Sequence, residues 1–322
     1  MISVAMATYN GEKFLKEQLD SIFSQTMPID ELVICDDCSK DKTIEIIQSY
    51  QKRYPIKLFQ NEKNLGYKLN FKEAMDYCSG DFIFLCDQDD IWMKDKVGKM
   101  ISKIQGNSKI QALASSFVYI DSKENELPVK LEPGKSNNNF YFKPVEKGDC
   151  VRVEFEEFYN HNYFQGCSLV ITKALKNQVI THFSTMVAHD YLINFTAALN
   201  DGMYFWNIPL FKYRLHGKNT IGVQDINAGL IQKMRNRNTF YLRTVTAKDG
   251  IKMLLALQES NPSFYNQRKE YYDKKIQFYK EHINVLKERK FFRLLLENMN
   301  PYYREFKGLE SRGMDLLYAI MG

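Results

Sequence analysis

Short apolar runs alternate with segments of helical period through the first third of the chain, and this alternation restricts the fold more than any other feature. The apolar runs occupy residues 2–9, 31–37, 56–61 and 81–87. Each of the first three is followed by a helix-periodic segment, at residues 12–25, 39–50 and 67–78. Strands that alternate with helices of about 10–15 residues form βαβ units around a parallel sheet. The sequence therefore predicts an α/β fold with a mostly parallel sheet flanked by helices.

Polar residues collect where the predicted strands end. The set comprises Thr8, Tyr9, Asn10, Asp36, Asp37, Asn61, Asn64, Asp87, Asp89 and Asp90. In open α/β sheets, ligands bind in the crevice outside the carboxyl ends of the strands. We therefore expect a ligand-binding crevice at this edge of the sheet.

The stretch FIFLCDQDDIW, residues 82–92, places Asp87, Asp89 and Asp90 directly after an apolar run. Carboxylates this close raise one another's pKa unless a cation or a set of hydrogen-bond donors is nearby. An Asp-x-Asp pair at a strand end can bind one divalent cation, which also bridges substrate phosphates. The alternative is that these acids only cap the following helix and stabilise its positive end. The buried strand before them favours a site for Mg²⁺ or Mn²⁺.

Several other classes of protein are disfavoured. No G-x-G-x-x-G follows the first strand and no G-x-x-x-x-G-K-[ST] occurs, so dinucleotide and P-loop sites lack their phosphate cradles. No stretch approaches roughly 18 consecutive apolar residues, and no signal-peptide pattern opens the chain. The six cysteines are scattered, as is usual for reduced thiols. We expect a cytoplasmic protein without a nucleic-acid partner.

The charge differs between the two ends of the chain. Residues 226–322 carry 18 basic and 10 acidic side chains, whereas residues 1–225 carry 26 basic and 29 acidic ones. We therefore predict a catalytic domain over residues 1–225 and a basic helical region over residues 226–322. An apolar stripe of coiled-coil spacing runs through the second part, at Tyr272, Ile276, Tyr279, Ile283 and Leu286. Three roles stay open for this region: packing on the catalytic domain, peripheral attachment to the inner membrane leaflet, and formation of a homodimer.

Four blocks in order, VAMATYNG, ELVICDDCSKDKT, NEKNLGYKLNF and GDFIFLCDQDDIW, resemble the inverting family 2 glycosyltransferases. The resemblance covers about residues 1–220. The forms DQDDIW, HDY and YRLHGKN look most like the rhamnosyltransferase-like branch of that family. The resemblance implies a GT-A fold, with a Rossmann-like sheet and metal-dependent binding of a sugar nucleotide.

The matching motifs imply a first group of donor-binding residues. Thr8, Tyr9 and Asn10 would line the nucleoside pocket. Asp36 would accept a hydrogen bond from N3–H of a uracil or thymine, although an acid at this position also suits helix capping. Asn64 would approach the ribose and the phosphates.

A second group would hold the diphosphate and the metal. Asp87 resembles the family residue that binds ribose, and Asp89 the one that binds metal, while Asp90 is expected to be a capping or supporting group. Arg214 and His216 lie in YRLHGKN. Arg214 would steady the leaving diphosphate, and His216 would be a further metal ligand or a structural histidine.

An inverting transfer needs a general base to take the proton of the acceptor hydroxyl. Asp190 resembles the family's catalytic acid at the start of the acceptor-side helix. The alternative is an N-terminal helix acid stabilised by the helix dipole. His189 stands where many family members have Glu, and its role stays open.

These motifs favour an inverting glycosyltransferase that uses a dTDP- or UDP-sugar. The transferred sugar would be a hexose or a deoxyhexose, with the resemblance favouring rhamnosyl, and the acceptor a saccharide or a lipid-linked precursor of a bacterial surface polysaccharide. A nucleotidyltransferase of similar fold is the enzymatic alternative, but it would show a Gly-rich basic loop after the first strand, and ATYNGEKF is not one. A non-catalytic carbohydrate-binding scaffold is the other alternative, and the full set of acids argues against it.

Overall fold

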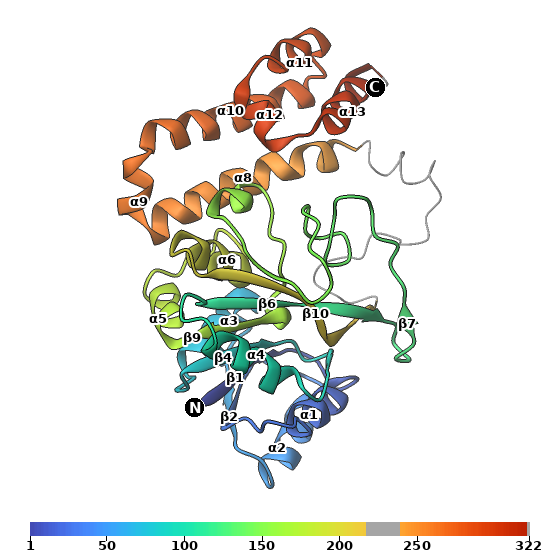
Figure 1. Cartoon of the computed structure of the whole chain (residues 1–322), viewed down its shortest axis with the longest axis vertical. Coiled ribbons are helices and arrows are strands. Elements are labelled where there is room, and N and C mark those ends of the chain that lie inside the picture. The colour runs from blue at the N-terminus through green and yellow to red at the C-terminus, as the bar shows by residue number, and fades with distance from the viewer. Residues whose placement is uncertain (217–238, 321–322) are drawn as a thin grey trace. The chain divides into compact units, whose positions relative to one another are not determined.

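The computed structural model describes residues 1–216 and 239–320 (Figure 1). The described residues form two compact units, one of residues 1–155 with 162–216 and the other of residues 156–161 with 239–320. The predicted domain boundary between residues 225 and 226 lies outside the described residues. Among the described helices, none is long and apolar enough to cross a membrane.

The first unit is built on one mixed sheet. Its described strands are β1 (Ile2–Thr8), β2 (Glu31–Asp36), β3 (Ile56–Gln60), β4 (Phe82–Cys86), β5 (Ile91–Trp92), β6 (Ala112–Ile120), β7 (Glu126–Leu127), β8 (Cys150–Arg152), β9 (Leu169–Thr172) and β10 (Met203–Arg214). The main path runs β3-β2-β1-β4-β9-β6-β10-β5, with β7 on β6 and β8 on β10.

The directions of the strands decide which residues meet at one edge. β1, β2, β3 and β4 are mutually parallel, β9 is antiparallel to both β4 and β6, and β10 is parallel to β6. Because two reversals restore the original direction, β6 and β10 run the same way as β1. The carboxyl end of β10 therefore lies at the same edge as those of β1, β2 and β4. The predicted fold of a mostly parallel sheet with flanking helices is confirmed.

Helices cover both faces of this sheet. They are α1 (Leu15–Phe23), α2 (Thr43–Gln51), α3 (Tyr67–Asp76), α4 (Lys96–Gln105), α5 (Lys173–Thr181) and α6 (His189–Leu199), with a 3₁₀ turn η2 at Gly166–Ser168. Val4 and Met6 of β1 belong to the core that includes Leu19 of α1 and Met100 of α4. Since side chains alternate along a strand, the residues between them face α3, which contacts β1 and β2.

The second unit is helical. After the short 3₁₀ helix η1 (Phe155–Tyr159), which begins in the first unit, it contains α8 (Phe240–Ser260), α9 (Pro262–Gln267), α10 (Lys269–Lys287), α11 (Phe291–Glu297), α12 (Pro301–Phe306) and α13 (Leu309–Ile320). Proline opens α9 and α12, where its missing N–H costs nothing, and an asparagine side chain caps each start. These local signals divide the region into short helices.

The apolar stripe predicted in the C-terminal region lies on α10. Tyr272, Ile276, Tyr279 and Leu286 are buried, and α10 packs along α8 within the same unit (Figure 1). Tyr279 also donates a hydrogen bond to Asn160 at 2.6 Å. Four of the five stripe residues are therefore enclosed by their own unit and cannot join two copies of the chain, while Ile283 is half-buried.

Candidate active site

The candidate site lies where β1, β2, β4 and β10 end. Its nucleoside side is built on Asp36, the last residue of β2, which is almost completely buried. The Asp36 carboxylate accepts hydrogen bonds from the Thr8 hydroxyl at 2.8 Å and from the Ser39 N–H at 2.8 Å. The carboxylate thus fixes the ends of two strands, and its contact with a base stays a prediction.

Asp37 has a role that the sequence did not reveal. Its carboxylate accepts hydrogen bonds from the N–H groups of Leu65 at 2.7 Å and Gly66 at 2.8 Å. Gly66 has a φ of 79°, which favours glycine, and the Asn64 side chain donates to the Asp37 carbonyl at 3.2 Å. Asp37 therefore holds the turn that contains Asn64 beside the end of β2.

Gln88 links the end of β1 to the segment that joins β4 to β5, residues 87–90, which we call the acidic loop. Its side-chain amide accepts from the Tyr9 N–H at 2.9 Å and donates to the Tyr9 carbonyl at 3.0 Å. The next residue, Asn10, has a φ of 48°, and its side chain accepts a hydrogen bond from the Lys40 N–H at 2.8 Å. Tyr9 keeps half of its surface exposed at this edge. The backbone of residues 9 and 10 is thus fixed, while the Tyr9 ring faces solvent.

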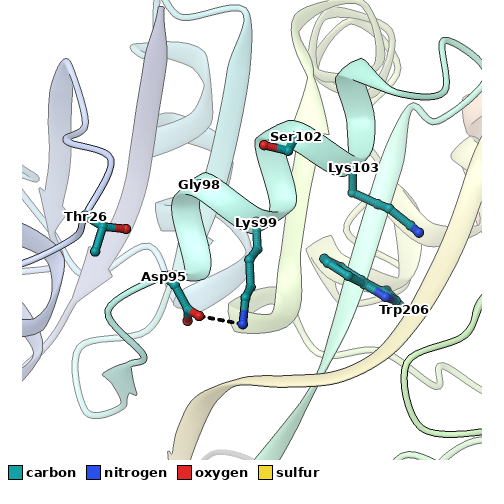
Figure 2. A pocket seen from close by; sticks show the side chains of 7 residues that line it. All are labelled: Thr26, Asp95, Gly98, Lys99, Ser102, Lys103 and Trp206. Atoms are coloured by element: carbon teal, nitrogen blue, oxygen red, sulfur yellow. Dashed lines mark ion pairs between the residues drawn. The ribbon is translucent and has the colours of Figure 1, made fainter.

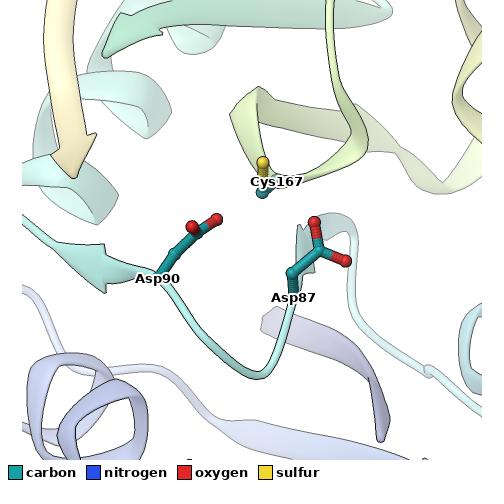
Figure 3. Close-up of side chains that lie close together, drawn as sticks. All are labelled: Asp87, Asp90 and Cys167. Carbon is teal, nitrogen blue, oxygen red and sulfur yellow. The ribbon is translucent and has the colours of Figure 1, made fainter. Parts of the chain in front are cut away.

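Asp87, Asp90 and Cys167 form a tight cluster behind the acidic loop (Figure 3), with one atom of each within 4.8 Å of the others. Burial, together with the nearby Asp89 and Asp190 carboxylates, raises the pKa of Asp87 to about 7. Burial also raises the pKa values of Asp90 and of the Cys167 thiol. Two carboxyl groups and a thiol this close could hold a metal ion, and because their pKa values are raised, binding one would release protons.

Lys96 supplies a cation to this cluster, and no sequence pattern predicted it. Its side chain is fully buried, its ammonium donates to the Cys167 carbonyl at 2.7 Å, and it lies 4.4 Å from the centre of the Trp92 ring. Burial lowers the Lys96 pKa to about 8, although Asp90 and Asp87 favour the charged form. Lys96 therefore offsets part of the negative charge that the acidic loop brings into the fold.

Asp89 and His216 meet at the more open side of the loop. Nε2 of His216 is 2.8 Å from Oδ2 of Asp89, and both side chains keep part of their surface exposed. A carboxylate oxygen and an imidazole nitrogen this close fit one divalent cation, with phosphate oxygens and water completing its shell. These two residues are the ones the motifs predicted as metal ligands, and the donor set fits that role.

Arg214 lies beneath these two residues. Only 1% of Arg214 is exposed, its Nε donates to the Asp89 carbonyl at 2.9 Å, and a terminal nitrogen pairs with Glu17. Its backbone N–H also donates to Asp90 at 3.1 Å, which makes Asp90 a supporting group, as expected. The guanidinium stacks 4.5 Å from the Phe14 ring. These contacts position the acidic loop, and a contact of Arg214 with a diphosphate stays a prediction.

Asp190 lies in the first turn of α6 on the other side of the site. Its carboxylate accepts hydrogen bonds from the N–H groups of Gly166 at 3.2 Å and Tyr191 at 2.7 Å. Burial raises the Asp190 pKa to about 6, although these hydrogen bonds oppose the shift. Asp190 also acts electrostatically on Asp87 and on Tyr67, so it lies near the acids of the donor side. A carboxyl group with a pKa near neutrality is suited to accept a proton.

His189, whose role the sequence left open, packs inward. Its ring stacks on Phe71 with centroids 4.0 Å apart, and burial lowers its pKa to about 3. Neither ring nitrogen has a hydrogen-bond partner among the described residues. A neutral, buried ring next to Asp190 can set the position of α6, but it cannot act as an acid near pH 7.

Two surface hollows lie outside this cluster. One of about 590 Å³ is lined by residues of β3 and α3 and by the segment that joins them, next to the turn held by Asp37. The other, of about 480 Å³, lies along α4 (Figure 2) and includes Lys103 and Trp206. Trp206 belongs to the first half of β10, whereas Arg214 ends it, so this second hollow is remote from the candidate site.

The sequence profile of glycosyl transferase family 2 matches residues 3–173, which is more than half of the 322 residues. This chain belongs to glycosyl transferase family 2. The family match covers β1 to β9 and contains all the predicted site residues except Asp190, Arg214 and His216. The chain is therefore a glycosyltransferase that uses a nucleotide sugar.

One sequence relative and two solved structures illustrate what this chain is similar to. The dTDP-rhamnosyl transferase RfbG of Shigella flexneri is 29% identical over 261 residues, covering 75% of this chain and 82% of that protein. The crystal structure of S. aureus TarS 1-349 in complex with UDP-GlcNAc has a TM-score of 0.56 at 18% identity, covering 99% of this chain and 89% of that one. The mannosyltransferase PcManGT from Pyrobaculum calidifontis, in complex with GDP-Man and Mn²⁺, has a TM-score of 0.54 at 15% identity, and the match covers 99% of this chain and 86% of that one.

Proposed function

We propose that this glycosyltransferase is inverting and metal-dependent, and that it transfers a rhamnosyl group from a dTDP-sugar to a saccharide acceptor. The observation that carries the proposal is that Asp190, whose pKa burial raises to about 6 and whose carboxylate is held by two backbone N–H groups, lies close enough to Asp87 to raise the pKa of that acid. The similarity to RfbG supports a dTDP-rhamnosyl donor. The TarS complex supports UDP as the alternative nucleotide.

In the proposed mechanism, the acceptor hydroxyl attacks the anomeric carbon on the face opposite the diphosphate. The bond from that carbon to the diphosphate oxygen breaks as the new glycosidic bond forms, so the configuration inverts. Asp190 takes the hydroxyl proton, and its hydrogen bonds from Gly166 and Tyr191 hold the accepting oxygens in place. Asp87 would bind the ribose of the donor.

Asp89 and His216 would hold Mg²⁺ or Mn²⁺, which when bound neutralises charge on the leaving diphosphate. Mg²⁺ is bound in proteins through oxygen, so the His216 nitrogen favours Mn²⁺. The PcManGT complex with Mn²⁺ supports this choice. Thr8, Tyr9, Asn10, Asp36 and Asn64 would form the nucleoside side.

The proposal is tested with purified enzyme, Mn²⁺ and four donors: dTDP-rhamnose, UDP-galactose, UDP-glucose and UDP-GlcNAc. We expect the largest kcat/KM with dTDP-rhamnose and NMR evidence of inverted anomeric configuration in the product. Asp190→Asn should lower kcat at least 100-fold with an unchanged donor Kd, since it removes the base and keeps the shape. Asp89→Asn should weaken the binding of Mn²⁺ and donor together. Retained configuration, or an Asp190→Asn variant with full kcat, would refute the mechanism.

We also propose that residues 226–322 attach the enzyme peripherally to the inner membrane leaflet, where a lipid-linked acceptor would be accessible. The excess of basic residues in this region supports the proposal. The homodimer is the alternative, although burial of the α10 stripe removes the surface first suggested for it. The family assignment leaves the nucleotidyltransferase alternative without support.

A further inference from the structure

The α11 helix exposes an apolar face. Phe292 is 80% exposed, Leu295 43%, Leu296 62% and Met299 76%. These residues follow the i, i+3, i+4, i+7 spacing that normally marks the buried face of a helix, with Met299 just beyond the helix end. Here that face points to solvent, and we call these four residues the α11 apolar face.

The opposite side of the same helix is what holds it in place. Leu294 is fully buried and packs in a cluster with Leu286 of α10 and Tyr318 of α13. Glu297 turns inward as well, and its carboxylate lies 2.6 Å from Nδ1 of His282. The exposure of the apolar face therefore follows from how α11 is anchored, because rotating the helix to bury the face would expose Leu294 and Glu297.

Several basic residues lie in and just before α11, and among them Lys290 pairs with Glu288 and Arg289 lies over the Tyr318 ring. Lys287, Arg289, Lys290 and Arg293 are all exposed. Glu288 is the single exposed acid between residues 287 and 299. An exposed apolar strip bordered by several cations is the arrangement of helices that lie in the interface of an anionic bilayer.

A second copy of the chain fits this surface poorly. A contact confined to the four residues of the α11 apolar face would be much smaller than a stable interface, which uses about 20–30 residues on each side. Pairing two such faces would also bring their cationic borders together, and like charges oppose such pairing. An anionic lipid surface satisfies both the apolar and the cationic side chains.

We propose that the α11 apolar face inserts into the interface of an anionic lipid bilayer, with the neighbouring cations at the headgroups. This inference sharpens the membrane proposal for residues 226–322 by assigning attachment to one short helix. It does not depend on which sugar is transferred. Sugar transfer to a water-soluble acceptor is therefore expected to be independent of α11.

The test is flotation of the full chain with vesicles of phosphatidylcholine and phosphatidylserine. The apolar variant is Phe292→Ser, Leu296→Ser and Met299→Ser combined, and the charge variant is Arg289→Gln, Lys290→Gln and Arg293→Gln combined. Leu131→Ser, a 52% exposed leucine of the first unit, is the matched control. All these positions are exposed, so far-UV circular dichroism should be unchanged.

We expect the wild type and the Leu131→Ser control to float with anionic vesicles, and the apolar variant to bind at least tenfold more weakly. The charge variant should lose the preference for anionic over neutral vesicles. Equal flotation of the apolar variant, or no flotation of the wild type at low salt, would overturn the proposal. A dimer seen by light scattering, lost in the apolar variant and unaccompanied by flotation, would overturn it in favour of self-association. Unchanged kcat on a soluble acceptor in the variants separates these outcomes from a failure of the proposed reaction.

Discussion

Replacing Gly166 by alanine tests whether the η2 turn positions the proposed base. A Cβ atom at this position would lie 2.8 Å from Nε2 of His189 and 3.7 Å from Cβ of Asp190. Nonbonded heavy atoms prefer about 3.5–4.0 Å, so the His189 ring would have to move by at least roughly half an ångström. The ring is buried and stacks 4.0 Å from Phe71, which leaves it little room.

Two separate effects follow from that contact. Overpacking of a buried site costs about 1–3 kcal/mol, so the free energy of unfolding should fall by that amount. The Gly166 N–H already reaches Asp190 over 3.2 Å, so any movement of the turn weakens this hydrogen bond and shifts the carboxylate. A misplacement of about 1 Å can cost 100-fold in rate, so we expect kcat to fall by about 10- to 100-fold. The donor KM should change little, because the residues on the nucleoside side are untouched.

Gly98→Ala is the matched control. Gly98 lies inside α4, and a Cβ there would be 3.5 Å from the Met27 side chain, an ordinary contact. Alanine in a helix interior should raise the free energy of unfolding by about 0.5–1 kcal/mol without changing kcat. Urea unfolding measures the free energy of unfolding of each variant, and steady-state kinetics measures its kcat.

A double-mutant cycle identifies the cause. His189→Ala opens space for the new methyl group, so Gly166→Ala should cost less stability in that background than in the wild type. Additive effects, within about 0.5 kcal/mol, would show that the two residues do not compete for space. A Gly166→Ala enzyme with wild-type kcat and stability would refute the assigned role of the turn.

Three further predictions concern buried charges. Asp190 has a pKa of about 6, above its ordinary 3.8, so kcat should rise as the pH passes about 6 and Asp190→Asn should remove this dependence. Because the raised pKa favours the protonated folded state, the stability it contributes is complete below about pH 4 and is lost as the pH rises through about 6. Lys96→Met should lower the free energy of unfolding by about 1–3 kcal/mol in urea titration, since it leaves the buried Cys167 carbonyl without the ammonium that donates to it at 2.7 Å. Asp315→Asn should cost about 3–5 kcal/mol, because Asp315 is fully buried and accepts from the Lys307 ammonium at 2.6 Å. An unchanged urea midpoint in either variant would contradict these assignments.

The local pattern of apolar and polar residues was enough to predict the strands of the first half of the sheet. Each apolar run became a strand within two residues of its predicted ends, because a buried parallel strand is a continuous apolar run and polar residues end it. Strand β6 was missed. Its sequence ALASSFVYI contains serines where burial would suggest apolar residues, yet Ser115 and Ser116 are buried between neighbouring strands.

Long-range packing determined the site residues that the sequence did not reveal. Lys96 lies in MKDKVGKM, which looks like a solvated helix start. Its burial depends on Phe211 of β10 and on the Cys167 carbonyl, which are far along the chain. Gln88 and Asp37 form contacts to segments 79 and 28 residues away, respectively. No spacing rule within one segment reports such contacts.

The antiparallel direction of β9 explains why the η2 turn contacts both Lys96, beside the donor-side acids, and Asp190, the proposed base. β9 runs against β4 with Phe84 opposite Val170, so the residues before β9 lie beside those after β4. Extending this register brings Cys167 level with Asp87, as the cluster of their side chains requires. The η2 turn therefore offers its Cys167 carbonyl to Lys96 and its Gly166 N–H to Asp190. Had β9 been parallel, that turn would lie at the opposite edge of the sheet, and the proposed base would lose the hydrogen bond from the Gly166 N–H.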